Sequence, residues 1–317
     1  MNFYKNSPQL NRRNFLQKAS ALGIISMLPG SMFSSNTTLS KKLGVNLGVI
    51  TYSFRTMPGS AEDLLSYLAE LELNSTELMG DPAEAFAGAP IRPKVKNWRN
   101  QTDKEKESMQ AWQKALHNWR MNPPMEKFKE LKKMYAKEGV AIDIIKFNLA
   151  RMDDDEVNYA FKVAKALNAR GITLERSDAA MQRLAPFASE HKLKIGYHNH
   201  AKVNFNSWDK GLELSDYNAL NLDIGHYVAG TNESPIPLIK KYHNRITNLH
   251  LKDRKKDNGA NLPWGEGDTP IGEVMRLMRD EKYDFQAGIE LEYKIPEGSN
   301  AVKEVKNCID FVKDALA

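Results

Sequence analysis

From Leu43 onward, short apolar runs alternate along the chain with longer segments whose apolar residues recur at helical spacing. Short runs rich in Val, Ile and Leu predict buried strands, and the longer segments predict amphipathic helices. Strict alternation of strand and helix is typical of βαβ units in a parallel sheet. The predicted strands lie at 45–52, 73–79, 140–147, 171–176, 193–198, 220–224, 246–251 and 285–291.

Segments with residues typical of helix starts lie between these strands. Ser60 precedes a helix with acidic residues in its first turn, and three Asp residues lead the helix at 154–168. Further helices are predicted at 124–137, 270–279 and 300–316. Eight strands alternating with helices over about 275 residues are more than a doubly wound sheet needs. We therefore predict an α/β fold, a single (β/α)8 TIM barrel at 41–317.

One connection is much longer than the others and interrupts the alternation of strands and helices. Residues 80–122 form a long insertion after the second strand, with Trp98, Trp112 and Trp119 and a helical pattern at 105–119. Long connections in compact domains are often lids, and this one leaves the strand end where barrel active sites lie. We expect either a lid whose Trp residues stack on a sugar ring, or an anchor packed against the barrel.

Residues 1–40 have the pattern of a targeting segment. The pair Arg12-Arg13 is followed by two apolar residues, a lysine and a weakly apolar stretch at 19–33. That stretch is too short to span a bilayer as a stable helix, so we expect a protein that is not embedded in the membrane. The segment resembles a twin-arginine (Tat) signal, although Asn11 stands where the usual motif has Ser or Thr. We expect export to the periplasm.

The distribution of charged residues along the chain indicates which kinds of partner the protein can bind. The chain has 317 residues and a net charge of +5, with acidic and basic residues interleaved. A nucleic-acid-binding surface usually concentrates Lys and Arg on one face, so we expect no nucleic-acid partner. Cys308 is the single cysteine, which excludes an intrachain disulfide and a thiolate metal site. A homo-oligomer is compatible with the sequence.

Polar side chains gather at the carboxyl ends of the predicted strands. Side chains alternate along a strand, so residues of one parity face the barrel axis together. Asp223 and His250, for example, each lie between two aliphatic residues. The same alternation places further acids and histidines on the axis: Glu77, Glu175, His198, His200, Glu290 and Glu292.

These residues predict a metal site. Buried carboxylates without partners are costly, and a metal cation would satisfy them. Two or three carboxylates with imidazole suit one divalent metal ion such as Mn²⁺, Co²⁺, Mg²⁺ or Zn²⁺. Open coordination positions would let the ion polarise a substrate carbonyl or neighbouring hydroxyls.

Three motifs resemble the xylose-isomerase-like superfamily of sugar phosphate isomerases and epimerases. They are Leu222-Asp223-Ile224-Gly225-His226, Asn248-Leu249-His250-Leu251-Lys252-Asp253 and Ile289-Glu290-Leu291-Glu292. The loop Gly265-Glu266-Gly267-Asp268 also matches one that these proteins commonly carry. The resemblance covers 44–315 and implies a xylose-isomerase-like barrel holding one divalent metal through Asp223, His250, Glu290 and a fourth ligand. It also implies that His226 contacts substrate or lies near the metal.

The fifth strand departs from the family. Ketose 3-epimerases of the superfamily carry a metal-binding glutamate at its end, which is also one of two acid/base residues. Here that place reads Tyr197-His198-Asn199-His200, with no carboxylate. Either His198 replaces the glutamate as ligand, or Glu175 reaches across from the neighbouring strand. We favour Glu175 as ligand, which leaves His198 free as a base with a pKa near the working pH.

The resemblance implies proton abstraction beside a carbonyl, with the metal stabilising the enediolate. Our leading expectation is a sugar isomerase or epimerase with His198, Glu175 and Glu290 as catalytic residues. The alternative is a lyase or hydratase that eliminates a β-oxygen from a keto-sugar or 3-keto-glycoside, which an exported location and a His base favour. A non-catalytic sugar-binding barrel is the remaining class. Each reading has a small carbohydrate as partner, with substrate contacts expected from Glu77, His200, His226 and Lys252.

Overall fold

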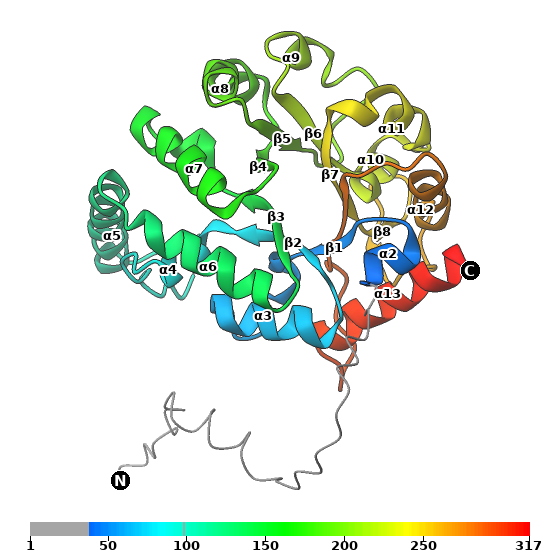
Figure 1. The fold of residues 1–317 in the computed structure, drawn as a ribbon, viewed down its shortest axis with the longest axis horizontal. Coiled ribbons are helices and arrows are strands. Elements are labelled where there is room, and N and C mark those ends of the chain that lie inside the picture. The colour runs from blue at the N-terminus through cyan, green and yellow to red at the C-terminus, as the bar shows by residue number, and fades with distance from the viewer. Residues whose placement is uncertain (1–37, 98) are drawn as a thin grey trace, which may run out of the picture. The chain divides into compact units, whose positions relative to one another are not determined.

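In the computed structural model, which describes residues 38–97 and 99–317, eight parallel strands close into a barrel surrounded by helices (Figure 1). Each predicted strand corresponds to one barrel strand, which confirms the (β/α)8 TIM-barrel fold. The strands are β1 Leu47–Ile50, β2 Ser75–Met79, β3 Ala141–Lys146, β4 Gly171–Glu175, β5 Lys194–His198, β6 Asn218–Asp223, β7 Ile246–Leu251 and β10 Gln286–Ile289. Residues 1–37 and Trp98 lie outside the described residues, so the signal and the periplasmic location stay predictions.

Helices cover the outside of the barrel. They are α2 Leu39–Leu43, α3 Ala61–Glu70, α4 Gly80–Phe86, α5 Asp103–Met121, α6 Met125–Lys137, α7 Asp154–Leu167, α8 Asp178–His191, α9 Asp209–Glu213, α10 Ile224–Thr231, α11 Ile236–Tyr242, α12 Ile271–Asp280 and α13 Ala301–Leu316. Three short 3-10 turns, η1 Thr51–Phe54, η2 Leu149–Arg151 and η3 His243–Arg245, and the hairpin β8–β9 (Asp253–Arg254 with Asn261–Leu262) complete the described elements. None of the helices in this part of the chain is long and apolar enough to cross a membrane.

Local sequence explains where several helices begin. The Ser60 hydroxyl accepts a hydrogen bond from the backbone N–H of Asp63, whose carboxylate accepts one from the Ser60 N–H. The same reciprocal cap starts α7 at Asp153 and α5 at Thr102. Such capping boxes satisfy backbone donors that the first helical turn leaves unpaired, which fixes the helix start.

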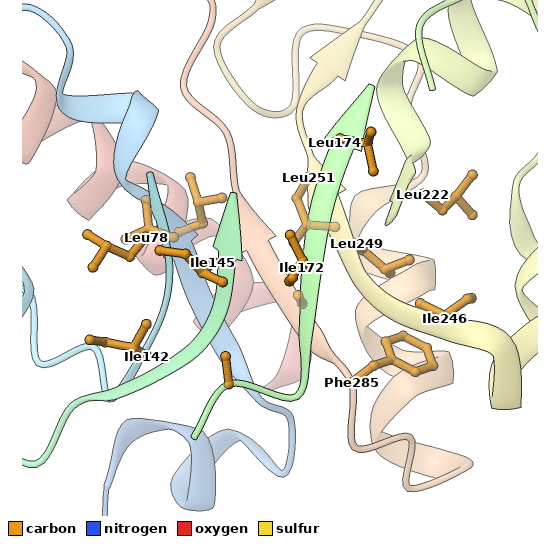
Figure 2. Packing of buried hydrophobic residues seen from close by; sticks show 14 of the residues in the cluster. Leu78, Ile142, Ile145, Ile172, Leu174, Leu222, Ile246, Leu249, Leu251 and Phe285 are labelled. Atoms are coloured by element: carbon orange, nitrogen blue, oxygen red, sulfur yellow. The ribbon is translucent and has the colours of Figure 1, made fainter. Parts of the chain in front are cut away.

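The apolar core lies between the barrel and its helices. Leu222, Leu249 and Leu251 point outward from their strands and are buried completely (Figure 2). The residues that alternate with them along the strands are polar and buried and point inward, as the strand parity predicts; they are Asn221, Asp223, Asn248 and His250. The interior is also narrow, because a side chain at Gly196 would collide with Thr247 from β7. The barrel therefore presents its polar residues as a packed layer beneath the carboxyl ends of the strands.

The insertion at 80–122 is a helical extension fixed to the barrel. It contains α5, as the pattern indicates, and also α4, which the pattern does not predict. The Arg120 guanidinium on α5 donates to both Glu84 carboxylate oxygens at 2.7 and 2.9 Å and to Glu156 on α7 at 3.1 Å. The Trp119 ring packs 6.1 Å from Tyr159, between ring centroids. Trp119 therefore acts as an anchor, whereas Trp112 borders a cavity described below.

Candidate metal centre and catalytic cavity

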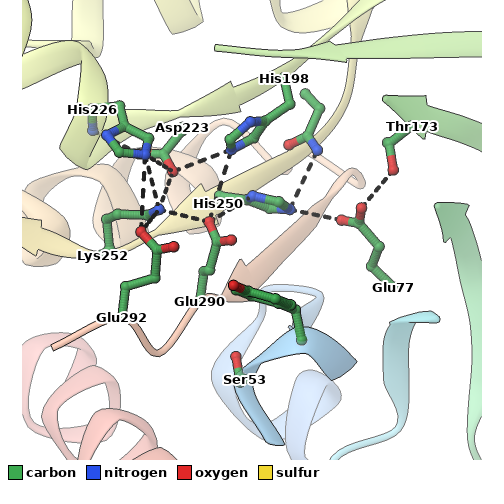
Figure 3. A network of polar contacts seen from close by, with 12 residues as sticks. Ser53, Glu77, Thr173, His198, Asp223, His226, His250, Lys252, Glu290 and Glu292 are labelled. Carbon is green, nitrogen blue, oxygen red and sulfur yellow. Dashed lines mark hydrogen bonds and ion pairs between the residues drawn. The ribbon is translucent and has the colours of Figure 1, made fainter. Parts of the chain in front are cut away.

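Four buried side chains meet at the carboxyl end of the barrel: His198 from β5, Asp223 from β6, His250 from β7 and Glu290 just after β10 (Figure 3). One potential ligand atom from each lies within 4.8 Å of the others. Strand register explains the meeting, because Asp223 pairs with His250 and His250 pairs with Gly288, two residues before Glu290. Each of the four residues is at most 5% exposed, so the group lies beneath the surface.

The four donors fit a divalent metal ion. Two carboxylates and two imidazoles form a mixed oxygen and nitrogen set of the kind that divalent transition metals bind. His250 Nδ1 and Glu290 Oε2 lie 2.9 Å apart without a hydrogen bond of acceptable geometry among the described residues, although the Lys252 ammonium lies 2.8 Å from the same Glu290 oxygen. Buried polar atoms rarely lack partners, so a shared cation is the simplest way to satisfy both.

Glu77 on β2 supports His250 from below. Its Oε2 lies 2.8 Å from His250 Nε2 and accepts a hydrogen bond from Asn248 Nδ2 at 2.6 Å, while Oε1 accepts one from Thr173. A carboxylate on one ring nitrogen leaves the other nitrogen free to bind a metal. Glu77 is fully buried and does not line the cavity described below, so the geometry favours this supporting role over the substrate contact expected from sequence.

Changing Glu77 to Gln should lower metal affinity by about 10- to 100-fold, the usual effect of losing a carboxylate behind a ligating histidine. The amide can no longer take the His250 N–H with a full negative charge. Isothermal titration with Mn²⁺ measures the change, and Glu70→Gln, on the exposed face of α3, is the matched control. Equal Mn²⁺ affinity in Glu77→Gln and wild type would contradict the role of Glu77.

Glu175 lies beside this group rather than within it. Its Oε2 lies 3.0 Å from His198 Nδ1 and 2.9 Å from His200 Nε2, and its Oε1 accepts a hydrogen bond from Lys146 at 2.8 Å. The Glu175 side chain is 51% exposed, whereas His198 Nε2 points inward, 3.4 Å from Asp223 Oδ2. This geometry favours His198 as the fourth ligand with Glu175 behind it, the alternative to the assignment we preferred from sequence.

Lys252 adds a cation to the same group. Its Nζ lies 2.8 Å from Asp223 Oδ2, 2.8 Å from Glu290 Oε2 and 2.6 Å from Glu292 Oε2. It also lies 3.2 Å from His226 Nε2, while Arg254 contacts His226 Nδ1 at 2.6 Å. Burial lowers the pKa of His226 to about 4 against the opposing charge of Asp223, so this ring is neutral at neutral pH.

Proton affinities in the centre are shifted by the packed charges. Burial lowers the pKa of His198, but hydrogen bonds to Asp223 and Glu175 outweigh it and raise the pKa well above its usual value. Burial also lowers the pKa of His250, and the charges of Glu290 and Glu77 raise it overall. For Glu290, burial raises the pKa, but His250 and Lys252 hold it well below the ordinary range. Without metal, the two histidines therefore hold their protons to a higher pH than a free imidazole does.

Thermal stabilisation by added metal should grow as pH rises from about 6 to 8, because the ion must displace protons that the folded protein holds on His198 and His250, whose pKa is raised above the free value of about 6.5. The raised pKa of His198 and His250 stabilises the metal-free fold below the unfolded value, and this contribution is lost as pH rises through the folded value. Melting curves with and without Mn²⁺ across this range measure the trend. A metal-induced shift that stays constant with pH would contradict it.

The centre opens into a cavity of about 300 Å³. His200, His226 and Lys252, three of the expected substrate contacts, line it together with Glu175, His198 and Glu290. Sequence reasoning missed Tyr52 and Lys146, which also line it. Lys146 follows two isoleucines, so its strand lacks the alternation of polar and apolar residues that would show Lys146 facing the axis. In addition, the pairing of β2 with β3 shifts register between Thr76 and Glu77, which changes which β3 residues lie beside β2.

A family model described as the xylose isomerase-like TIM barrel matches residues 107–314. The chain belongs to this family, as its motifs indicate.

Among the curated relatives of the chain are inosose dehydratases. The chain is 28% identical over 159 residues to the inosose dehydratase of Clostridium tetani, covering 43% of this chain and 53% of that protein. It is 30% identical over 136 residues to the inosose dehydratase of Clostridium beijerinckii, covering 41% of this chain and 38% of that protein. The chain thus spans about half the length, or less, of the curated relatives it matches.

Solved structures share the fold. A probable 3-DHS dehydratase, AsbF, from Bacillus anthracis superposes with a TM-score of 0.60 at 15% identity, covering 85% of this chain and 99% of that one. A sugar phosphate isomerase/epimerase from Parabacteroides distasonis gives 0.58 at 16% identity, covering 92% of this chain and 100% of that one. At these identities the likeness concerns the fold alone.

Proposed function

We propose that the protein is a metal-dependent lyase that eliminates an oxygen substituent β to the ketone of an oxidised sugar. The observation that carries this proposal is the buried group of His198, Asp223, His250 and Glu290, of which His198 and Glu290 line the cavity. The relatives named as dehydratases support elimination over the isomerase or epimerase reaction that we expected first. The proposed reaction class therefore differs from our leading expectation, and the proposed ligand set keeps Asp223, His250 and Glu290 but has His198 in place of Glu175.

A divalent metal bound by these four side chains would act as a Lewis acid toward the substrate carbonyl or a neighbouring hydroxyl. The residues around it would bind and orient the sugar. Lys252 and His226 line the cavity together, and the neutral His226 imidazole can hydrogen-bond a hydroxyl group while the Lys252 ammonium adds positive charge. The carboxylates of Asp223 and Glu290 also hold Lys252 in place through contacts of 2.8 Å.

Elimination also needs a proton acceptor beside the α-carbon. His200 lines the cavity at the rim, and the Glu175 carboxylate fixes its ring through Nε2, which leaves Nδ1 for the substrate. The base takes the α-proton, the electron pair forms a carbon–carbon double bond, and the carbon–oxygen bond breaks. The leaving oxygen takes up a proton and departs as an alcohol or water, with no net oxidation.

The dependence on a ketone tests this function. Metal-loaded protein should release the leaving group from a 3-keto-glucoside but not from the parent glucoside, because only the ketone acidifies the proton at C2. A chelator should abolish the release, and added Mn²⁺ or Co²⁺ should restore it. Cleavage of the parent glucoside at a similar rate would indicate hydrolysis and refute elimination.

A further inference from the structure

A second, larger cavity adjoins the catalytic one. Its volume is about 890 Å³, compared with about 300 Å³ for the catalytic cavity. Met79, Lys146 and Glu175 line both cavities, so the two meet at these side chains. Pockets that hold one small molecule span about 300 to 1,000 Å³, so the smaller cavity alone already lies within the range for one compact ligand.

The inserted helix α5 forms one side of the larger cavity. Trp112 lines it, with Met109 and Leu116 from the same helix. The indole N–H of Trp112 donates to the Pro90 carbonyl at 2.9 Å, and the Arg92 guanidinium lies 5.3 Å from the ring centroid. Because Arg120 fixes α5 to α4 and α7, this aromatic side is held in place. Fixed aromatic rings stack well on the rings of ligands.

The cavity also provides hydrogen-bond donors. Arg151 lines it and has no ion-pair partner among residues 38–97 and 99–317. Lys146, at the boundary between the two cavities, donates to Glu175 at 2.8 Å and is 17% exposed. A ligand here would meet an aromatic ring and apolar side chains from α5 together with cationic donors such as Lys146 and Arg151. This combination fits a ring that carries hydroxyl groups or an aromatic face.

We propose that the larger cavity binds the leaving group of the substrate, and that this group is a ring joined through oxygen to the carbon β to the ketone. The inference rests on the proposed lyase function. The bond to be broken then lies beside Lys146 and Glu175, where the cavities meet. If the leaving group were water, as in a dehydratase, the larger cavity would have no ligand. The substrate class is therefore a keto-glycoside whose leaving group is a second sugar or an aryl alcohol.

Three 3-keto-glucosides with methyl, phenyl and glucosyl leaving groups test the subsite. The ratio of kcat/KM for the phenyl or glucosyl substrate to that for the methyl substrate should fall by about tenfold in Trp112→Ala, the size of one aromatic stacking contact. Comparing ratios between proteins cancels the intrinsic reactivity of each leaving group. Trp264→Ala is the matched control, because Trp264 packs 5.9 Å from Phe311 and lines neither cavity. A ratio unchanged in Trp112→Ala for both larger substrates would overturn the proposal.

A binding measurement separates this proposal from the lyase function itself. Phenyl glucoside and a glucosyl-glucose disaccharide lack the ketone, so they can bind without reacting. Saturation-transfer NMR should show contact with the phenyl ring or the second sugar in wild type and its loss in Trp112→Ala, and the responding probe identifies the leaving-group class. Equal or absent transfer in both proteins would overturn the subsite. If no keto-glucoside reacts but this transfer is observed, the lyase function fails and the subsite stands.

Discussion

A His198→Ala variant should lose most of its bound divalent metal, and its elimination rate should fall by at least about a thousandfold, since a Lewis acid contributes several kcal/mol to such a reaction. His198 is 3% exposed, and its Nε2 lies within reach of both Asp223 and Glu290. Removing it would leave three ligands and a gap at the floor of the cavity. Elemental analysis of the purified variant and initial rates on a 3-keto-glucoside measure the two effects.

Glu175→Gln is the matched comparison for this prediction. If Glu175 lies behind His198, its loss should weaken metal binding by only about 10- to 100-fold, so the variant should still load at saturating metal. The 51% exposure of Glu175 agrees with a place outside the ligand set. The opposite pattern, with metal retained in His198→Ala and absent from Glu175→Gln, would return the fourth position to Glu175.

Replacing Arg120 by Met should lower the free energy of unfolding by about 3–5 kcal/mol, the usual cost of leaving a buried charge without its partner. Glu84 is 3% exposed and, among residues 38–97 and 99–317, its carboxylate would keep only the Tyr159 hydroxyl, at 3.0 Å, as a hydrogen-bond donor. The helix α5 would also lose its contact with Glu156. Urea unfolding followed by circular dichroism measures the change.

Two further variants serve as controls for the unfolding measurement on Arg120→Met. Lys127→Met breaks a pair whose side chains are 49% and 53% exposed, and such surface pairs contribute little to stability. The double variant Arg120→Met with Glu84→Leu should regain part of the lost stability, because it removes the unpaired charge. A urea midpoint for Arg120→Met equal to that of wild type would show that this contact does not anchor α5.

The barrel and the inward direction of its polar residues follow from local sequence patterns. Aliphatic residues on both sides of Asp223 and His250 can be buried only if those two face the axis, and the register of β6 and β7 then brings them side by side. The helix starts at Ser60 and Asp153 are equally local, because each cap satisfies its own first turn. These features depend on neighbours a few residues away.

Features that depend on distant segments were harder to predict. Parity places both Glu175 and His198 toward the axis, but only the closed barrel shows that Glu175 ends at the rim and His198 at the floor. Glu77 was assigned to substrate because nothing in its own strand shows that His250 and Asn248 lie against it, 173 and 171 residues away. The second cavity, likewise, exists only because α5 packs back against the barrel.

The most direct test of the central claim is one incubation of metal-loaded protein with a 3-keto-glucoside in D₂O, followed by NMR. The account predicts that the leaving group appears in solution as the proton at C2 disappears, with formation of a ketone conjugated to a new carbon–carbon double bond. Deuterium entering at C2 of a glycoside that remains intact, with an isomer or epimer as product, would contradict the lyase assignment.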